Sequence, residues 1–114
     1  MKKKLLIFTA ILSGILIQGC TQESEDIWID VRSQEEYDTG HLENVWHIPH
    51  EQIAERILEV TDNKDATIHL YCRSGGRAGR AKAALEELGF VNIINEGGYE
   101  DILKNRASEQ TLPN

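Results

Sequence analysis

Cysteine and basic residues are both scarce in this sequence of 114 residues. Only two cysteines occur, Cys20 and Cys72, and 12 Lys and Arg face 19 Asp and Glu, which gives a formal net charge of −7. Because an acidic surface repels phosphate groups, nucleic acid and anionic lipid headgroups are not expected as broad partners. The chain also lacks internal repeats and a nucleotide-binding fingerprint. A chain of this length supports one small domain.

The histidines do not form a metal-binding pattern. His47, His50 and His69 show no ligand spacing with one another or with Cys72, so neither a metal site nor another cofactor is expected. His41 has two interpretations. It could act as an acid or base, or it could be a partly buried histidine that bonds to the backbone.

The N-terminal residues have the order of an export signal. Three lysines at residues 2–4 precede an apolar run over residues 5–17, which is short for a membrane span. The run ends in Leu16-Ile17-Gln18-Gly19-Cys20, which resembles the cleavage motif of bacterial lipoproteins. The resemblance implies a signal peptide over residues 1–19 and a lipid on Cys20, which would anchor an exported domain in the periplasm or cell envelope. An ordinary cleaved signal and an uncleaved anchor are the alternatives.

The most informative stretch joins a short strand to a helix. Residues 67–71 form an apolar, β-like run, Cys72 follows directly, and residues 81–88 have the apolar spacing of an amphipathic helix. A tight loop before a helix points backbone N–H groups inward, and the helix N-terminus adds a partial positive charge. Both features favour an anion inside the loop, either the Cys72 thiolate or a bound oxyanion, and both lower the pKa of the thiol.

Glycine and arginine have separate roles in this loop. Gly75 and Gly76 can adopt the positive φ that a tightly closing loop needs. Arg73, Arg77 and Arg80 are spread along the turn and cannot all pack inside, so one or more should face whatever enters the loop. Arg80 lies furthest along and is expected to be an exposed charge. The alternative interpretation is a buried structural cysteine followed by an ordinary strand–helix turn.

The stretch Cys72-Arg73-Ser74-Gly75-Gly76-Arg77 resembles the active-site loop of the rhodanese family, whose sulfurtransferases carry a persulfide on one cysteine. The resemblance makes Cys72 the expected catalytic residue. The expected substrate-binding residues are Arg73, Ser74, Gly75, Gly76 and Arg77. Tyrosine-phosphatase-type loops place the arginine one residue later, where this chain has Ala78. The shorter loop is that of the sulfur-transferring members, and the chain is most similar to the small, exported single-domain rhodaneses.

A second motif that supports the resemblance begins at Asp30. The sequence Asp30-Val31-Arg32 is similar to the family's D-x-R element, and an E-[FY] element follows it. Ser33 and Glu36 have the spacing of a capping box at a helix start. Asp30 and Arg32 are expected to support the site, either as a surface salt bridge that holds this helix onto the sheet or in direct contact with substrate.

Two more segments are similar to rhodanese patterns. Residues 40–49 resemble G-H-[IV]-x-G-A-x-N-[IL]-P, with Asn44 in place of a glycine. Asparagine is the residue other than glycine that best tolerates positive φ. Glu96-Gly97-Gly98-Tyr99 resembles the G-G-[WYF] element that follows the last strand of the family.

The order of elements predicts an α/β domain over residues 27–106. Strands are expected at 27–32, 67–71 and 90–94, and helices at 51–60, 81–88 and from Glu100. The buried face of the middle helix is predicted to contain Ala81, Ala84, Leu85 and Leu88, and Gly89 is expected to end this helix. Right-handed connections then give a rhodanese-like three-layer fold, in which a small parallel sheet of four or five strands has helices on both faces and strand 67–71 at its centre. Residues 20–26 form the lipidated cysteine and linker, and residues 107–114 a disordered polar tail.

The resemblance implies a sulfurtransferase that moves sulfane sulfur from a donor such as thiosulfate to cyanide or a dithiol through a persulfide on Cys72. Arg73 and Arg77 are the candidates for neutralising the donor, although Arg77 could instead close the loop by bonding its carbonyls. The alternatives are an anion-binding or redox-sensing module without turnover, and a phosphatase or arsenate reductase. A monomer is expected. A disulfide between Cys20 and Cys72 is not expected, because it would consume the reactive thiol.

Overall fold

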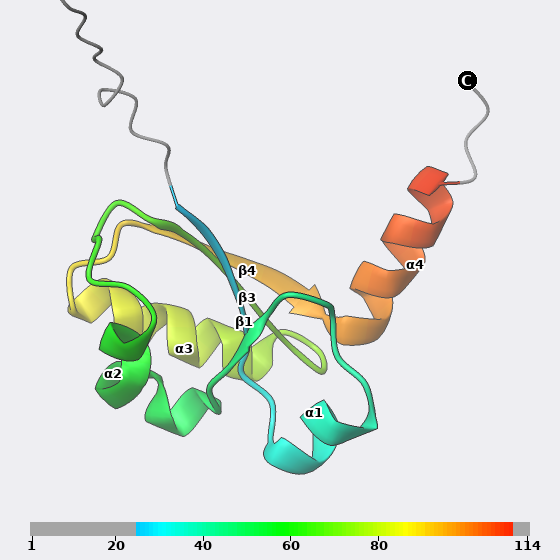
Figure 1. The fold of residues 1–114 in the computed structure, drawn as a ribbon, viewed down its shortest axis with the longest axis horizontal. Coiled ribbons are helices and arrows are strands. Elements are labelled where there is room, and N and C mark those ends of the chain that lie inside the picture. Colours follow the sequence, from blue (N-terminus) through cyan, green and yellow to red (C-terminus); the bar gives the residue numbers. More distant parts are fainter. Residues whose placement is uncertain (1–24, 111–114) are drawn as a thin grey trace, which may run out of the picture.

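The computed structural model describes residues 25–110, which fold around a four-stranded parallel sheet (Figure 1). The strand order across the sheet is β2-β1-β3-β4. The strands are β1 (Asp26–Asp30), β2 (Trp46–His47), β3 (Thr67–Cys72) and β4 (Asn92–Gly98). The helices are α1 (Gln34–Thr39), α2 (Ile53–Arg56), α3 (Gly76–Glu87) and α4 (Tyr99–Gln110), and the 3₁₀ turns His50–Gln52 and Ile57–Glu59 flank α2. The predicted signal peptide and Cys20 lie outside the described residues.

Strand β3 lies inside the sheet, as its apolar sequence predicts. It pairs with β1 from Asp26 opposite Thr67 to Asp30 opposite Tyr71, and with β4 on its other side. All the pairings are parallel, so the carboxyl ends of the strands meet at one edge of the sheet. Open parallel sheets place their ligand sites outside that edge, which is where Cys72 ends β3.

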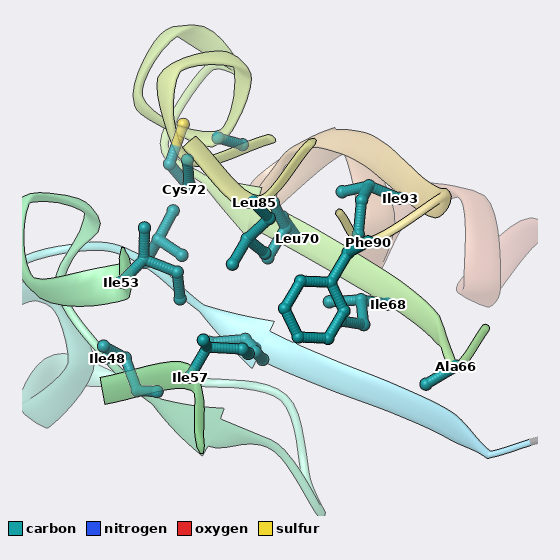
Figure 2. Close-up of a cluster of buried hydrophobic side chains, with 14 residues drawn as sticks. Ile48, Ile53, Ile57, Ala66, Ile68, Leu70, Cys72, Leu85, Phe90 and Ile93 are labelled. Carbon is teal, nitrogen blue, oxygen red and sulfur yellow. The ribbon is translucent and has the colours of Figure 1, made fainter. Parts of the chain in front are cut away.

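Apolar clusters lie on both faces of the sheet, as the predicted three-layer fold requires. The larger cluster joins β1 and β3 to α2 and α3, and it includes Ile29, Ile53, Leu70, Leu85 and Phe90 (Figure 2). Cys72 lies at one end of this cluster, with its sulfur beside the segment that leads into α3 (Figure 2). The smaller cluster on the other face contains Leu42, Tyr71 and Ile102, with Ile102 supplied by α4.

Three local predictions are confirmed by the backbone. Ser33 caps α1, and the reciprocal bonds of a capping box with Glu36 are both present. Asn44 has a φ of 61° and is the non-glycine residue with positive φ among residues 25–110. Gly89 follows α3 with a φ of 100°, as expected of a residue that ends a helix.

Two element boundaries differ from the prediction in the region around α3. Helix α3 begins at Gly76, not near Ala81, because the first helical turn is formed by the glycine-rich loop itself. Its buried side chains are Ala78, Ala81 and Leu85, whereas Leu88 lies beyond the helix end and is 42% exposed. Strand β4 begins at Asn92 and continues through Gly98, because Phe90 turns into the core before the strand starts and Gly98 still pairs with Cys72 of β3.

The remaining helices also differ from their predicted form. The stripe over residues 51–60 is not one helix but a short α2 between two 3₁₀ turns, with Ile53 and Ile57 as its buried side chains. Helix α4 continues to Gln110, so it includes the first part of the segment predicted to be a disordered tail. Among residues 25–110, no helix has both the length and the apolar content that crossing a membrane would require.

Candidate functional site at the end of strand β3

The candidate site lies at the carboxyl end of β3, where residues 73–75 turn the chain from sheet into helix. Cys72 is the last residue of β3, and Gly75 is the N-cap of α3. Gly75 adopts a φ of 103°, as predicted, whereas Gly76 is already helical and its φ is not positive. Because the helix starts so soon after Cys72, its first N–H groups and its positive dipole end face the thiol.

The Cys72 thiol is held by backbone donors. The side chain is only 1% exposed, and the Gly75 N–H donates to Sγ at 2.9 Å. Burial by itself would raise the pKa of Cys72, but the backbone N–H groups of Ala78, Ser74, Gly75 and Arg77 stabilise the thiolate and lower the pKa below its ordinary value. The loop therefore stabilises negative charge on this sulfur. The sequence interpretation used Ala78 only to distinguish this loop from the phosphatase type, and it did not predict a role for the Ala78 N–H.

Strand β4 supports the loop from behind. The Asn95 side chain donates to the Gly75 carbonyl at 2.9 Å and accepts from the Gly97 N–H at 2.9 Å. Gly98 packs so close to the loop that a Cβ at this position would overlap the Arg73 carbonyl oxygen. This contact gives a physical reason for the second glycine of the Gly97-Gly98 pair, which resembles the rhodanese pattern. Asn95 had no signal in the sequence.

Arg77 does not bond the loop carbonyls, which corrects one of the two roles predicted for it. Its Nη1 and Nη2 donate to the two carboxylate oxygens of Glu36 at 2.7 and 3.0 Å. The hydrogen bond from Arg77 is the largest of the effects that lower the pKa of Glu36, to about 2. Glu36 also accepts from the Ser33 N–H and hydroxyl, so the capping box of α1 fixes the carboxylate that holds Arg77.

Asp30 and Arg32 form an ion pair beside the loop, as one of the two interpretations expected, but the pair is buried and does not lie at the surface. Arg32 donates from Nε and Nη2 to the Asp30 carboxylate, the shortest of these bonds being 2.7 Å, and Nη2 also donates to the Gly40 carbonyl at 2.7 Å. The Arg32 guanidinium lies 4.5 Å from the centre of the Tyr99 ring. The pair therefore joins β1 to the segment after α1 and to the start of α4.

A hollow of about 280 Å³ lies next to the loop. Its lining residues are Arg32, Glu36, Thr39, Arg73, Tyr99 and Glu100. Arg73 is exposed and connects the hollow to the cysteine loop, whereas Cys72 itself does not line it. The sequence interpretation missed Thr39, Tyr99 and Glu100, because α1 and α4 meet at this point only in three dimensions.

The side chains of His41, His47 and His69 form hydrogen bonds with backbone carbonyls and carboxylates of the protein, and none of these bonds involves the Cys72 thiol. His41 is exposed, with Nδ1 2.9 Å from the Tyr37 carbonyl oxygen, so it bonds to backbone as one interpretation expected but is not partly buried. His47 contacts the Arg32 carbonyl at 2.9 Å. His69 lies between the carboxylates of Asp26 and Glu96, 2.6 Å from each. No cluster of three or more potential metal ligands occurs in the part of the chain that the structure describes.

Comparison with known proteins shows where this arrangement recurs. The sequence model of the rhodanese-like domain family matches residues 15–105 of this chain. The thiosulfate sulfurtransferase PspE of Escherichia coli strain K12 is 39% identical over 75 residues, which are 66% of this chain and 72% of PspE. A solved structure of a rhodanese with anions from E. coli superposes with a TM-score of 0.64 at 37% identity and covers 67% of this chain and 89% of that one.

Longer proteins contain a similar segment as well. The tRNA uridine(34) hydroxylase of Enterobacter sp. strain 638 is 32% identical over 107 residues, which are 90% of this chain but only 30% of the hydroxylase. The parallel sheet, the cysteine loop and the family match over most of the chain agree with one another. The chain therefore belongs to the rhodanese-like domain family.

Proposed function

We propose that this protein is a sulfurtransferase that moves sulfane sulfur from a donor such as thiosulfate to a thiophilic acceptor through a persulfide on Cys72. The observation that carries the proposal is the buried Cys72 sulfur, which receives backbone N–H groups from a loop at the N-terminus of α3. The similarity to PspE, a thiosulfate sulfurtransferase, supports the same reaction class.

In the first half-reaction the Cys72 thiolate attacks the outer sulfur of thiosulfate. A bond forms between the two sulfur atoms, the bond from the outer sulfur to the sulfonate breaks, and its electron pair leaves with sulfite. The terminal sulfur of the new persulfide carries the negative charge that the thiolate brought. The N–H groups of Ser74, Gly75, Arg77 and Ala78, which already surround Sγ, are placed to stabilise that charge.

In the second half-reaction an acceptor removes the terminal sulfur. Cyanide or a thiolate forms a bond with that sulfur, the persulfide S–S bond breaks, and Cys72 returns to the thiolate. The cycle is a double displacement, so ping-pong kinetics are expected.

The two arginines of the loop divide the work. Arg77 forms an ion pair with Glu36, so it helps to fix the shape of the loop and its positive charge is partly neutralised. Arg73 is exposed beside the hollow and has no ion pair among the described residues, which leaves it free to meet an incoming anion. Arg73 is therefore the residue that we assign to steering the anionic donor.

The competing reactions are distinguished by their products. A phosphatase or arsenate reductase would also use a thiolate in an anion-binding loop, but the longer loop of those enzymes would place an arginine where this chain has Ala78. A redox-sensing module would form no thiocyanate.

The test is a steady-state assay of thiocyanate from thiosulfate and cyanide, with a phosphate ester as the alternative substrate. Thiocyanate release with ping-pong kinetics, absent in Cys72→Ser, supports the proposal, and phosphate release alone would contradict it.

We further propose that the protein is exported and anchored in the cell envelope by a lipid on Cys20. The proposal rests on the basic, apolar and Leu16-to-Cys20 segments of the sequence. The expected result is recovery of the protein in the membrane fraction and its release from that fraction in Cys20→Ala. Equal membrane association of wild type and Cys20→Ala would contradict lipidation at this residue.

A further inference from the structure

The hollow beside the loop is lined by positively and negatively charged residues. Two of these four residues form ion pairs with other residues of the protein. Arg32 is paired with Asp30 at 2.7 Å, and Glu36 is paired with Arg77 at 2.7 Å. These internal pairs neutralise one another and leave those side chains no net charge to offer a ligand. The remaining ionic residues of the hollow are Arg73 and Glu100.

Arg73 and Glu100 have opposite charges and are not paired, with each other or with any other group in the described part of the chain. Both are exposed and both line the same hollow, Arg73 from the loop after β3 and Glu100 from the first turn of α4. Their charged atoms are too far apart for a direct salt bridge. The space between them can therefore take a molecule that carries an ammonium group at one end and a carboxylate at the other.

The proposed donor does not explain Glu100. Thiosulfate is a dianion, and a carboxylate beside its path repels it. An acceptor that carries a positive charge would instead be attracted. We propose that the hollow is an acceptor subsite for a small thiol of the amino-acid type, in which Glu100 binds the ammonium group and Arg73 binds the carboxylate. This inference rests on the sulfurtransferase function proposed above, since it names the acceptor class of the same site.

The dimensions and position of the hollow agree with this assignment. A volume of about 280 Å³ accommodates an amino acid but not a folded partner. Because Cys72 does not line the hollow, the hollow holds the part of the acceptor that does not react, and the acceptor sulfur extends past Arg73 towards the persulfide. Arg73 serves in turn the anionic donor and the carboxylate of the acceptor, which cannot occupy the site together.

The transfer step is balanced without a further reactant. The acceptor thiol gives its proton to the terminal sulfur of the anionic persulfide, and the resulting thiolate forms a bond with that sulfur. The S–S bond to Cys72 breaks, and its electron pair leaves with Cys72 as the thiolate. The product is the persulfide of the acceptor, which keeps the proton.

The experiment separates loading from discharge. The purified protein is loaded with thiosulfate, the persulfide is confirmed by intact mass, and excess donor is removed. Single-turnover discharge is then followed with four thiols: cysteine (both charges), cysteamine (ammonium only), 3-mercaptopropionate (carboxylate only) and 2-mercaptoethanol (neither). Rates are divided by the thiolate concentration, because thiolate is the attacking species. Cysteine is expected to be fastest, by about fivefold for each charge recognised.

Variants assign the charges. In Glu100→Gln, the rate at which cysteine and cysteamine discharge the persulfide is expected to fall about fivefold. The rates with 3-mercaptopropionate and 2-mercaptoethanol should stay unchanged. In Arg73→Gln, the discharge rates with the two thiols that carry a carboxylate, cysteine and 3-mercaptopropionate, are expected to fall. Asp101→Asn is the matched control, because Asp101 is an exposed carboxylate in the same turn of α4 that does not line the hollow. Asp101→Asn should keep the wild-type order of discharge rates among the four thiols. That result would exclude a general effect of negative charge in the first turn of α4.

Two results would overturn the inference, and they differ. If the persulfide forms but the four thiols discharge it in the order of their intrinsic reactivity, in wild type and Glu100→Gln alike, the acceptor subsite is wrong and the sulfurtransferase function stands. If thiosulfate adds no sulfur to Cys72, the proposed function fails at the loading step, and the acceptor subsite fails with it.

Discussion

Glu36 and Arg77, 41 residues apart in the chain, are joined by two hydrogen bonds between the first helix and the cysteine loop. Because Glu36 is also part of the capping box at Ser33, one carboxylate both starts α1 and fixes the last arginine of the loop. The geometry around Cys72 therefore depends on a helix that follows a different strand.

Replacing Glu36 tests this dependence. Glu36→Gln keeps a residue that is compatible with a capping box but removes the ion pair, so Arg77 is no longer held. Sulfur transfer from thiosulfate is expected to fall about tenfold while the fold is retained. Glu35→Gln, an exposed neighbour on α1, is the control and should retain wild-type turnover. A Glu36→Gln variant as active as Glu35→Gln would mean that the ion pair has no role in the loop.

The same pair gives a dependence of stability on pH. The pKa of Glu36 is lowered from its ordinary value of 4.5 to about 2, chiefly by Arg77. A carboxyl whose pKa is lower in the folded state contributes stability that is present above the unfolded pKa and is lost as the pH falls through the folded pKa. The difference in melting temperature between wild type and Glu36→Gln should therefore shrink between about pH 4.5 and pH 2. A difference that stays constant over that range would refute the pairing.

The thiol should be ionised at lower pH than an ordinary cysteine. Burial opposes this, but the surrounding N–H groups outweigh it and lower the pKa of Cys72. The ultraviolet absorbance of the thiolate, measured against pH as the difference between wild type and Cys72→Ser, removes the contribution of Cys20. The midpoint is expected below that of a free thiol. A midpoint at or above the free-thiol value would contradict the anion-binding character of the loop.

The buried ion pair beside the loop should be costly to break. Asp30 is fully buried and accepts hydrogen bonds from the side chain of Arg32, two residues further along the chain. Asp30→Asn leaves the Arg32 charge uncompensated, and a loss of about 3–5 kcal/mol in the free energy of unfolding is expected. Glu59→Gln breaks the exposed Arg56–Glu59 pair instead and should cost no more than about 1 kcal/mol. Denaturant melts compare the two, and equal losses would show that burial of the pair is unimportant.

Gly98 should be essential although it lies outside the cysteine loop. A methyl group at this position overlaps the Arg73 carbonyl, so Gly98→Ala displaces the loop. Misplacement by about 1 Å can cost about 100-fold in rate, and a loss of that order in persulfide formation is expected. Gly79→Ala is the control, because Gly79 is helical, has only ordinary contacts around its Cβ position and should gain stability from a better helix former. Normal activity in Gly98→Ala would show that the loop tolerates the shift.

The parts of the site that are local in sequence could be predicted. The cysteine at the end of an interior strand, the positive φ of Gly75, the capping box and the positive φ of Asn44 all follow from short patterns. They could be predicted because each depends on the conformational range of one residue or on a spacing of a few positions.

The parts that could not be predicted depend on packing between distant segments. Nothing in a linear pattern pairs Arg77 with Glu36 or brings Glu100 of α4 to the hollow that Arg73 lines. The early start of α3 was missed because Gly76 and Gly79 are poor helix formers, and tertiary packing outweighs their propensity. The extent of β4 was missed because its two glycines indicate a turn locally, although Gly98 pairs with Cys72 of β3.

Intact mass before and after treatment with thiosulfate, for wild type beside Cys72→Ser, tests the central claim most directly. The account predicts that wild type gains the mass of one sulfur atom, that cyanide removes it, and that Cys72→Ser gains nothing. A folded wild-type protein that gains no mass, or a Cys72→Ser variant that gains as much as wild type, would contradict a Cys72 persulfide as the intermediate.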